Sequence, residues 1–264
     1  MSDNNPFPDP EAFAGDLKSA LAFLTRVPAG WLGMAVDRRP DFTRASGLFP
    51  VAGVLIGIVG GIVLALASAI GVPPLVAAAL AVATTMALTG ALHEDGLADV
   101  ADSLGGASAE RRLEIMHDSR IGTYGAAALV LSLVVRVACL AALLAHGAIA
   151  AAIGLALAEG ISRAALVRMW HELPPARDSG LAHDTGPPDT NAMVLALATA
   201  ALLAVIAVPV IGLKSAVLGA VFAALATYLF TRLTAQAVCG RTGDTLGACQ
   251  QVALLAWLIG AATL

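Results

Sequence analysis

The chain has 264 residues, of which 58% are hydrophobic and only 13% are charged, and its mean hydropathy is +0.83. This balance excludes an ordinary water-soluble domain and makes lipid the expected solvent. The formal net charge of −4 comes from carboxylates gathered in a few polar stretches. Because nucleic-acid binding needs a concentrated basic surface, we discard a nucleic-acid partner. The apolar residues are mainly small and aliphatic, which favours an all-α bundle of closely packed transmembrane helices.

The N-terminal segment differs from the rest of the chain. Residues 1–15 are rich in Pro, Asn and Asp and predict a disordered tail, while residues 16–264 form one membrane-embedded domain. The start lacks the basic and apolar regions of a signal peptide, so we expect the chain to enter the membrane through its own helices. The segment Phe13–Phe23 has apolar residues near helical spacing, which is typical either of a helix in the interface plane or of a solvated helix.

The apolar stretches that follow can be matched to the roughly 20 residues that a spanning helix needs. The run Ile121–Ala158 is too long for one helix, and His146-Gly147 near its middle predicts a break into two. About seven spans are therefore expected: Val51–Ile70, Leu75–Leu92, two within Ile121–Ala158, Ala192–Leu213, Ser215–Thr231 and Leu246–Leu264.

The distribution of Lys and Arg predicts the orientation in the membrane, because cytoplasmic loops collect positive charge. The residues before the first span include Lys18, Arg26, Arg38, Arg39 and Arg44, which places the N-terminus in the cytoplasm. With seven spans the other arginine-rich segments fall on the same side, whereas the opposite connections hold only turn residues, His146 and Lys214.

An acidic motif follows the second expected span. The stretch His93–Asp102 holds four carboxylates within nine residues, and Asp95, Asp99 and Asp102 have the spacing i, i+4, i+7. On a helix these three side chains project from one face, where like charges repel unless a cation lies between them. Mg²⁺ prefers a few carboxylates together with phosphate oxygens, so the motif predicts a magnesium site. The alternative is a solvated polar helix end.

A basic cluster precedes the third span. The stretch Arg111–Gly125 contains three arginines, and guanidinium groups bind phosphate oxygens through paired hydrogen bonds. Arg111 and Arg112 are equally well explained as positive-inside anchors. Arg120 lies between Asp118 and a glycine-bounded turn, which favours a positioned group that binds substrate.

A glycine-rich cluster precedes the last span. The stretch Gly240–Ala248 permits close backbone approach, and the opening amides of the following helix predict an anion site. Asp244 within it is a candidate functional carboxylate or, alternatively, an N-cap.

Two charges lie inside apolar stretches, where charges are costly and usually face the interior. Glu159 is four residues before Arg163, which predicts an ion pair on one helix. Arg136 has no partner nearby in the sequence, so it either lines the cavity or pairs with a carboxylate from elsewhere.

Taken together, the strings FLTRVP, FPVAGVLIG, HEDGLADVAD, RRLEIMHDSRIGTYG and GDTLGA resemble, in this order, the adenosylcobinamide-GDP ribazoletransferase (cobalamin synthase) family over residues 18–264. The resemblance implies a multi-pass inner-membrane transferase, dependent on Mg²⁺ and active on the cytoplasmic side. Such an enzyme condenses adenosylcobinamide-GDP with α-ribazole, or with α-ribazole 5′-phosphate, and releases GMP together with adenosylcobalamin or its 5′-phosphate. Glu94 stands where the family pattern leads us to expect leucine, so we do not expect it to be a ligand.

The site residues follow from matching these motifs to the reaction. Metal ligands are expected at Asp95, Asp99 and Asp102, and substrate contacts at Asp118, Arg120, Arg241, Gly243 and Thr245. The nucleophile is expected to be the 5′-hydroxyl of α-ribazole. The carboxylate that takes its proton is expected to be Asp102 or Asp244, with His93 as the second choice because an ordinary histidine titrates near neutrality. We also expect the three acidic-motif aspartates and Asp244 to meet around one cavity.

Two other functions fit part of the pattern. A CDP-alcohol phosphotransferase uses similar metal chemistry, but its signature needs an arginine where Asp99 stands. A cation-coupled transporter usually binds its ion near the membrane midplane, whereas these carboxylates lie at helix ends. The sequence leaves the oligomeric state and the number of metal ions open.

Overall fold

The structure is a computed structural model that describes residues 10–34, 41–177 and 185–263. Within these ranges the regular elements are helices, with no strand, so the predicted all-α class is confirmed. The helices are α1 (Pro10–Leu24), α2 (Phe42–Ala45), α3 (Phe49–Ala69), α4 (Pro74–Thr89), α5 (Leu92–Ser103), α6 (Ala109–Met116), α7 (Thr123–Leu143), α8 (Ala148–Glu172), α10 (Thr190–Ile211), α11 (Leu213–Val238) and α12 (Gly243–Ala261). Short 3-10 turns occupy Ala29–Leu32, Ser46–Leu48 and Leu144–His146.

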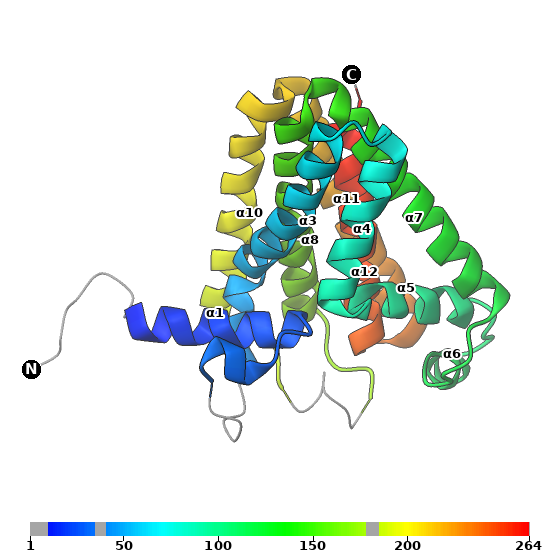
Figure 1. The fold of residues 1–264 in the computed structure, drawn as a ribbon. Helices are drawn as coiled ribbons and strands as arrows, with labels where there is room; N and C mark the ends of the chain where they lie inside the picture. The colour runs from blue at the N-terminus through cyan, green and yellow to red at the C-terminus, as the bar shows by residue number, and fades with distance from the viewer. Residues whose placement is uncertain (1–9, 35–40, 178–184, 264) are drawn as a thin grey trace, which may run out of the picture.

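The long helices form a bundle whose members run between two ends, and α1, α5 and α6 lie at the same end (Figure 1). Among the described residues, five helical segments are long and apolar enough to cross a membrane: 42–69, 123–146, 148–172, 190–211 and 213–238. The bent pair of α4 and α5 makes a sixth if it is counted as one span. The chain is thus a multi-pass membrane protein.

The predicted number of about seven spans exceeds this result for two reasons. Helix α4 has only 16 residues, and the chain then turns by 92° into α5 instead of continuing. Helix α12 does stand in the bundle, but Asp244, Gln250 and Gln251 lower its hydropathy. The predicted break at His146-Gly147 is confirmed, because α7 and its terminal turn end at His146 and α8 begins at Ala148.

Small residues allow α3 and α8 to pack closely. Gly53, Gly57 and Gly61 recur every four residues along the face of α3 that contacts α8. A methyl group at Gly57 would lie 2.5 Å from the Cα of Ala156, so a larger residue at this position would push the helices apart. Close backbone approach of this kind is how helices associate where lipid replaces water.

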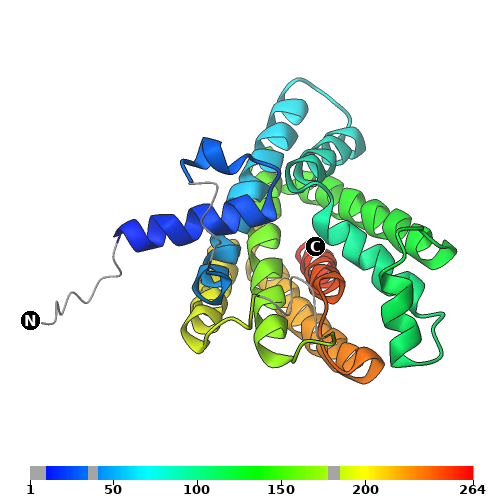
Figure 2. The ribbon, with the colours of Figure 1, turned by 90° about the horizontal axis from the view of Figure 1, so that it is seen from below.

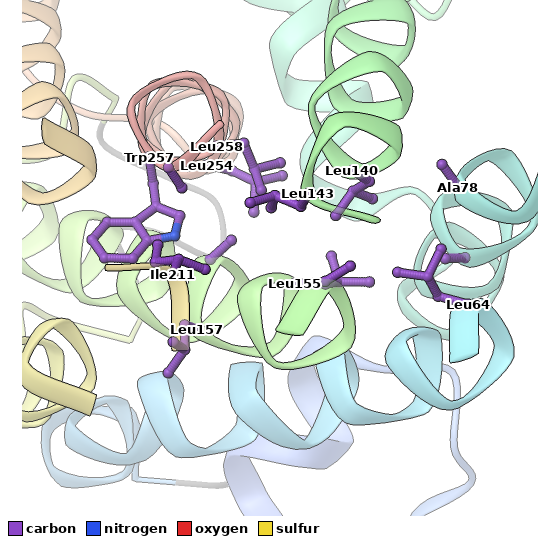
Figure 3. Packing of buried hydrophobic residues seen from close by; sticks show 14 of the residues in the cluster. Leu64, Ala78, Leu140, Leu143, Leu155, Leu157, Ile211, Leu254, Trp257 and Leu258 are labelled. Atoms are coloured by element: carbon purple, nitrogen blue, oxygen red, sulfur yellow. The ribbon is translucent and has the colours of Figure 1, made fainter. Parts of the chain in front are cut away.

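The core lies around α8 and α12. Helix α12 stands in the middle of the bundle when the molecule is viewed from the end that carries α1 and α5 (Figure 2). Figure 3 shows Leu155 of α8 packed with Leu64 and Leu140, and Trp257 of α12 in the same cluster. The outer faces of α7, α10 and α11 instead expose large aliphatic side chains, as expected for surfaces that contact lipid.

The turn between α4 and α5 is made by two residues with left-handed backbone conformations, Gly90 (φ 66°) and Ala91 (φ 55°). Arg26 lies against Gly90, where any side chain would collide with the guanidinium arm, and the Arg26 amide donates to the Leu88 carbonyl at 2.8 Å. Helix α5 consequently lies across the polar end of the bundle and outside the five spanning helices.

The predicted disordered tail at residues 1–15 extends too far. The residues from Pro10 onward belong to α1, while residues 1–9 lie outside the described part of the chain. Helix α1 lies across the end of the bundle (Figures 1 and 2), and its buried residues Ala20 and Leu24 pack against the apolar cluster that includes Phe49. The interface-plane position of this helix stays a prediction.

Candidate active site at the polar end of the bundle

Helices α5 and α12 touch through their backbones at the polar end. A methyl group at Gly96 would lie 2.6 Å from the Asp244 carbonyl oxygen, and one at Gly247 would lie 3.2 Å from the Cα of His93. A side chain at Gly96 would force the two helices apart, whereas a methyl group at Gly247 would require a shift of a few tenths of an ångström. The close approach brings Asp244 next to the acidic helix, although Asp244 follows Gly96 by 148 positions in the sequence.

Four carboxylates act on one another here. Asp99 is partly buried, and its pKa is raised to about 7, first by burial and then by the negative charges of Asp95, Asp244 and Asp102. Among the described residues, none of the salt bridges involves Asp95, Asp99 or Asp244. The predicted convergence of the acidic motif with Asp244 is therefore present in the structure, and the cluster has an excess of negative charge.

The cluster meets the chemical requirements of Mg²⁺ with fewer side chains than the sequence suggested. In the described part of the chain, no three Asp, Glu, His or Cys side chains are arranged to hold a metal ion. Mg²⁺ usually keeps several waters and takes one or two carboxylates plus substrate phosphate oxygens. The hard oxygen donors of Asp95 and Asp99, one helical turn apart and without a cationic partner in these ranges, fit that pattern.

Asp102 binds backbone amides at the start of another helix. Its two carboxylate oxygens accept hydrogen bonds from the backbone amides of Gly122 (2.7 Å) and Gly125 (2.8 Å) at the start of α7. Amides at a helix N-terminus have no partner within the helix, and a carboxylate there also interacts favourably with the helix dipole. The structure thus shows Asp102 anchoring α7 to α5, and its expected roles as metal ligand and proton acceptor stay predictions.

A cavity of about 170 Å³ opens beside the carboxylates. Asp95 and Asp244 form its polar side together with His93 and Gly243, whereas Asp99 and Asp102 do not line it. The remaining lining comes from Phe23, Phe42, Leu92, Leu166, Trp170, Thr185, Leu246 and Gly247. The cavity therefore has a carboxylate side and an apolar, partly aromatic side.

His93 lies at this cavity but is only 3% exposed. Burial and the positive charges of Arg163 and Arg136 lower the pKa of His93 well below its ordinary value. The reason for considering it as a proton acceptor, a pKa near neutrality, is therefore contradicted.

The start of α12 is shaped by a capping box. The Thr242 hydroxyl accepts from the Thr245 amide at 3.2 Å, and the Thr245 hydroxyl accepts from the Thr242 amide at 2.8 Å. Thr242 is thus the N-cap, and the alternative that Asp244 has this role is wrong. Thr245 is 1% exposed and used in the box, whereas Gly243 is exposed with open space beside it.

Arg241 does not reach the cavity lining. Its side chain is 2% exposed and donates to the Leu173 carbonyl, and its backbone exchanges hydrogen bonds with Pro174 and Ala176. Arg241 therefore joins the segment after α8 to the start of α12, and its predicted contact with substrate stays a prediction.

Arg120 lies on a separate polar groove, which is lined by Asp102, Arg111, Glu114, Ile115, Asp118, Arg120 and Gly122. Its side chain is 86% exposed, and its Nε and Nη2 atoms both donate to the Asp118 carboxylate. The Arg120 side chain holds the pKa of Asp118 at about 2, so this pair stays charged. Its predicted contact with substrate stays a prediction.

The structure adds two residues to the surroundings of Asp244 that the sequence did not single out for the site, Arg177 and His117. Burial raises the pKa of Asp244, and this effect is opposed by the positive charge of Arg177, the hydrogen bond from Thr242 and the charge of His117. The Arg177 guanidinium donates to the Leu113 carbonyl at 2.7 Å, which fixes it near α6. Their positions depend on the contact of α6, α12 and the segment after α8, which leaves no local pattern in the sequence.

A buried ion network lies directly beneath the first turn of α5. Arg136 of α7 donates to Glu94 of α5 at 2.6 Å and to Glu159 of α8 at 3.3 Å, and Arg163 donates to Glu159 at 2.5 Å. The four side chains are 1% to 4% exposed. The predicted Glu159–Arg163 pair is confirmed. Of the two interpretations of Arg136, the structure shows the pair with carboxylates from elsewhere in the chain.

These features define a class of protein: a polytopic α-helical membrane enzyme with an acidic site at the polar end of its bundle. The chain belongs to the cobalamin-5-phosphate synthase family, whose model matches residues 16–262. It is accordingly a membrane-embedded transferase of cobalamin synthesis. No solved structure matches the chain.

Curated relatives agree with this family. A protein of Azorhizobium caulinodans named adenosylcobinamide-GDP ribazoletransferase is 47% identical over 249 residues, covering 93% of this chain and 94% of the relative. Proteins of the same name from Rhizobium etli and Brucella melitensis are 44% and 43% identical, over 95% and 93% of this chain and 97% and 95% of their own lengths.

Proposed function

We propose that the chain condenses adenosylcobinamide-GDP with α-ribazole or α-ribazole 5′-phosphate, giving adenosylcobalamin or its 5′-phosphate and GMP. The observation that carries this proposal is the meeting of Asp95, Asp99 and Asp244 beside a cavity at the polar end of a membrane bundle. The names of the curated relatives support the corrinoid substrate.

The reaction is a displacement at phosphorus. A ribose hydroxyl oxygen of the nucleoside forms a bond to the phosphorus that stays with cobinamide, the anhydride bond to the guanylate phosphate breaks, and GMP leaves with the electron pair. Because the 5′-phosphate is retained when α-ribazole 5′-phosphate reacts, the attacking group is a secondary hydroxyl of the ribose and not the 5′-hydroxyl expected from the sequence.

Asp244 is the best-placed acceptor for the proton of that hydroxyl. It lines the cavity, and burial raises its pKa, which makes the carboxylate a stronger base than an exposed aspartate. Asp102 is less suited, because the amides of Gly122 and Gly125 already occupy both of its oxygens. His93 is a weaker proton acceptor, because protonation would place a positive charge on a buried ring near Arg163 and Arg136.

Asp95 and Asp99 are the residues that would hold Mg²⁺. When bound, this ion would neutralise the charge that develops on the nonbridging oxygens of the anhydride. The excess of negative charge around Asp99 supports a cationic partner, since like charges held this close are unfavourable without one.

Two cationic regions would face the phosphates of the substrate. Arg120 presents an exposed guanidinium on the polar groove that Asp102 also lines. Arg177 acts electrostatically on Asp244 and is held near α6, outside the residues that line the cavity. Exposed guanidinium groups bind phosphate oxygens through paired hydrogen bonds, and Gly243 adds an open helix N-terminus.

We place the site on the cytoplasmic side of the bacterial inner membrane. Helices α1 and α6 lie at the same end as α5, and they carry Lys18 and Arg111. The opposite connections carry only His146 and Lys214 among the charged or titratable residues described there. Positive charge collects on the cytoplasmic side, and the outer helix faces would contact membrane lipid.

The test is release of GMP from adenosylcobinamide-GDP by the purified full-length protein with α-ribazole and Mg²⁺ in detergent or vesicles. We expect stoichiometric GMP and adenosylcobalamin, lost when EDTA removes the metal and restored by Mg²⁺. Release of CMP from a CDP-alcohol instead would identify a phospholipid enzyme. Uptake of an ion into vesicles without any GMP release would identify a transporter.

A further inference from the structure

The apolar side of the cavity has no role in the displacement described above. Phe23 of α1, Phe42 of α2 and Trp170 of α8 line the cavity from three elements, whereas the carboxylates of the lining come from α5 and α12. Their ring centroids are 4.8 Å apart for Phe23 and Phe42 and 6.5 Å apart for Phe42 and Trp170. This wall is therefore a preformed aromatic surface.

The aromatic wall offers a ligand no free polar group, because its one indole N–H already donates within the protein. The Trp170 Nε1 atom donates to the Gly186 carbonyl at 2.9 Å, which also fixes the orientation of the ring. Phe42 and Trp170 are 7% and 3% exposed, and Phe23 is half-buried. A flat apolar group fits such a wall, whereas a heterocycle with several donors and acceptors would bury them unpaired.

The size and polarity of the cavity indicate which chemical group of the two substrates it can hold. An apolar cavity of about 150 Å³ holds one benzene ring, so a cavity of about 170 Å³ that is open on one side holds a single small ring system and excludes a corrin ring. Guanine carries donors and acceptors on most of its edge. The methylated benzimidazole base of α-ribazole carries none on its methylated edge.

We infer that this cavity is the seat of the base of α-ribazole, with the methylated ring against Phe23, Phe42 and Trp170 and the ribose toward Asp95 and Asp244. The inference rests on the proposed function and adds the part of the enzyme that selects the nucleoside. With the base in this seat, the ribose hydroxyls lie on the side of Asp244, where the proton is taken. Phe23 is then a specificity-determining residue.

The test uses Phe23→Leu, with Phe13→Leu as the matched control. Phe13 lies on the same helix, is 43% exposed and does not line the cavity. The affinity for α-ribazole alone is measured by calorimetry on the full-length protein, and KM is measured for each substrate. We expect Phe23→Leu to weaken α-ribazole about tenfold, in the range for small changes in an apolar pocket, while KM for adenosylcobinamide-GDP changes less than twofold. Phe13→Leu should change neither.

A nucleoside with unmethylated benzimidazole provides a second readout. The wild-type protein should bind it more weakly than α-ribazole, and Phe23→Leu should reduce that preference, because the wall that contacts the methyl groups is altered. If Phe23→Leu does not fold, Leu92→Trp, at another residue that lines the cavity, replaces it, with the same selective rise in KM for α-ribazole expected. Leu92 is 38% exposed, so the larger ring fits without entering the core.

The outcomes separate this inference from the proposed function. If the wild-type protein releases no GMP, the proposed function fails, while calorimetry with α-ribazole still decides whether the seat exists. If GMP release is normal but Phe23→Leu leaves α-ribazole binding unchanged, or weakens both substrates equally, the assignment of the cavity to the base is overturned and the proposed function stands.

Discussion

The buried network beneath α5 makes a sharp prediction for Glu94. The family resemblance, with leucine expected at this position, suggested that Glu94→Leu would be tolerated. The structure leads to the opposite expectation, because Glu94 is 3% exposed and accepts from Arg136 at 2.6 Å. Without Glu94, the single carboxylate of Glu159 faces both Arg136 and Arg163.

The magnitude follows from the charge that would be left unpaired. The network has two carboxylates and two guanidiniums, so it is neutral, and Glu94→Leu leaves one net positive charge in the core. Removing one partner of a buried pair typically costs about 3 to 5 kcal/mol, whereas replacing both partners by apolar residues is often neutral. We therefore expect a loss of that size for Glu94→Leu and recovery of most of it in Glu94→Leu with Arg136→Met.

The assay is equilibrium unfolding in mixed micelles followed by tryptophan fluorescence, with all variants at one protein concentration. The matched control is Glu172→Leu, which breaks the partly exposed pair with Arg168 and should cost less than about 1 kcal/mol. The reasoning is refuted if Glu94→Leu is as stable as the wild-type protein, or if adding Arg136→Met lowers the stability further.

Three further predictions concern activity. Asp99→Asn should insert normally but reduce kcat for GMP release at least about 100-fold, since a metal ligand supplies several kcal/mol; retention of most Mg²⁺-dependent activity would exclude Asp99 as a ligand. Arg120→Ala should weaken adenosylcobinamide-GDP binding about tenfold or more and Arg120→Lys by less, with α-ribazole binding unchanged; equal weakening of both substrates would mean that Arg120 is only an anchor. Gly96→Ala should lower kcat because its methyl group would collide with the Asp244 backbone at 2.6 Å, whereas Gly105→Ala, with 3.6 Å to its nearest neighbour, should be active; equal activity of the two would contradict the importance of the close approach.

The sequence predicted the helices because hydropathy and turn residues act locally. The break at His146-Gly147 and the Glu159–Arg163 pair are both local features, and both are confirmed. The meeting of Asp244 with the acidic motif was predicted from the demands of the chemistry, since the positions are far apart in the chain.

Other features could not be predicted, because they depend on contacts between distant segments. The 92° turn requires Ala91, a residue that rarely adopts a left-handed conformation, in addition to Gly90. The partners of Arg136 lie on two other helices, 42 and 23 residues away in the sequence. The aromatic wall likewise combines side chains of α1, α2 and α8, and no single segment carries its pattern.

These long-range contacts explain how an acidic helix can be held ready for its substrates. The first turn of α5 is fixed from below by the bond between Glu94 and Arg136, and its last turn is fixed by the bonds from Gly122 and Gly125 to Asp102. Asp95 and Asp99 lie between these two anchors. A site whose supporting groups are locked by buried hydrogen bonds loses little conformational freedom when substrate binds. Two of the four carboxylates in the motif therefore serve the other two, which accounts for a cluster of acids larger than a magnesium site requires.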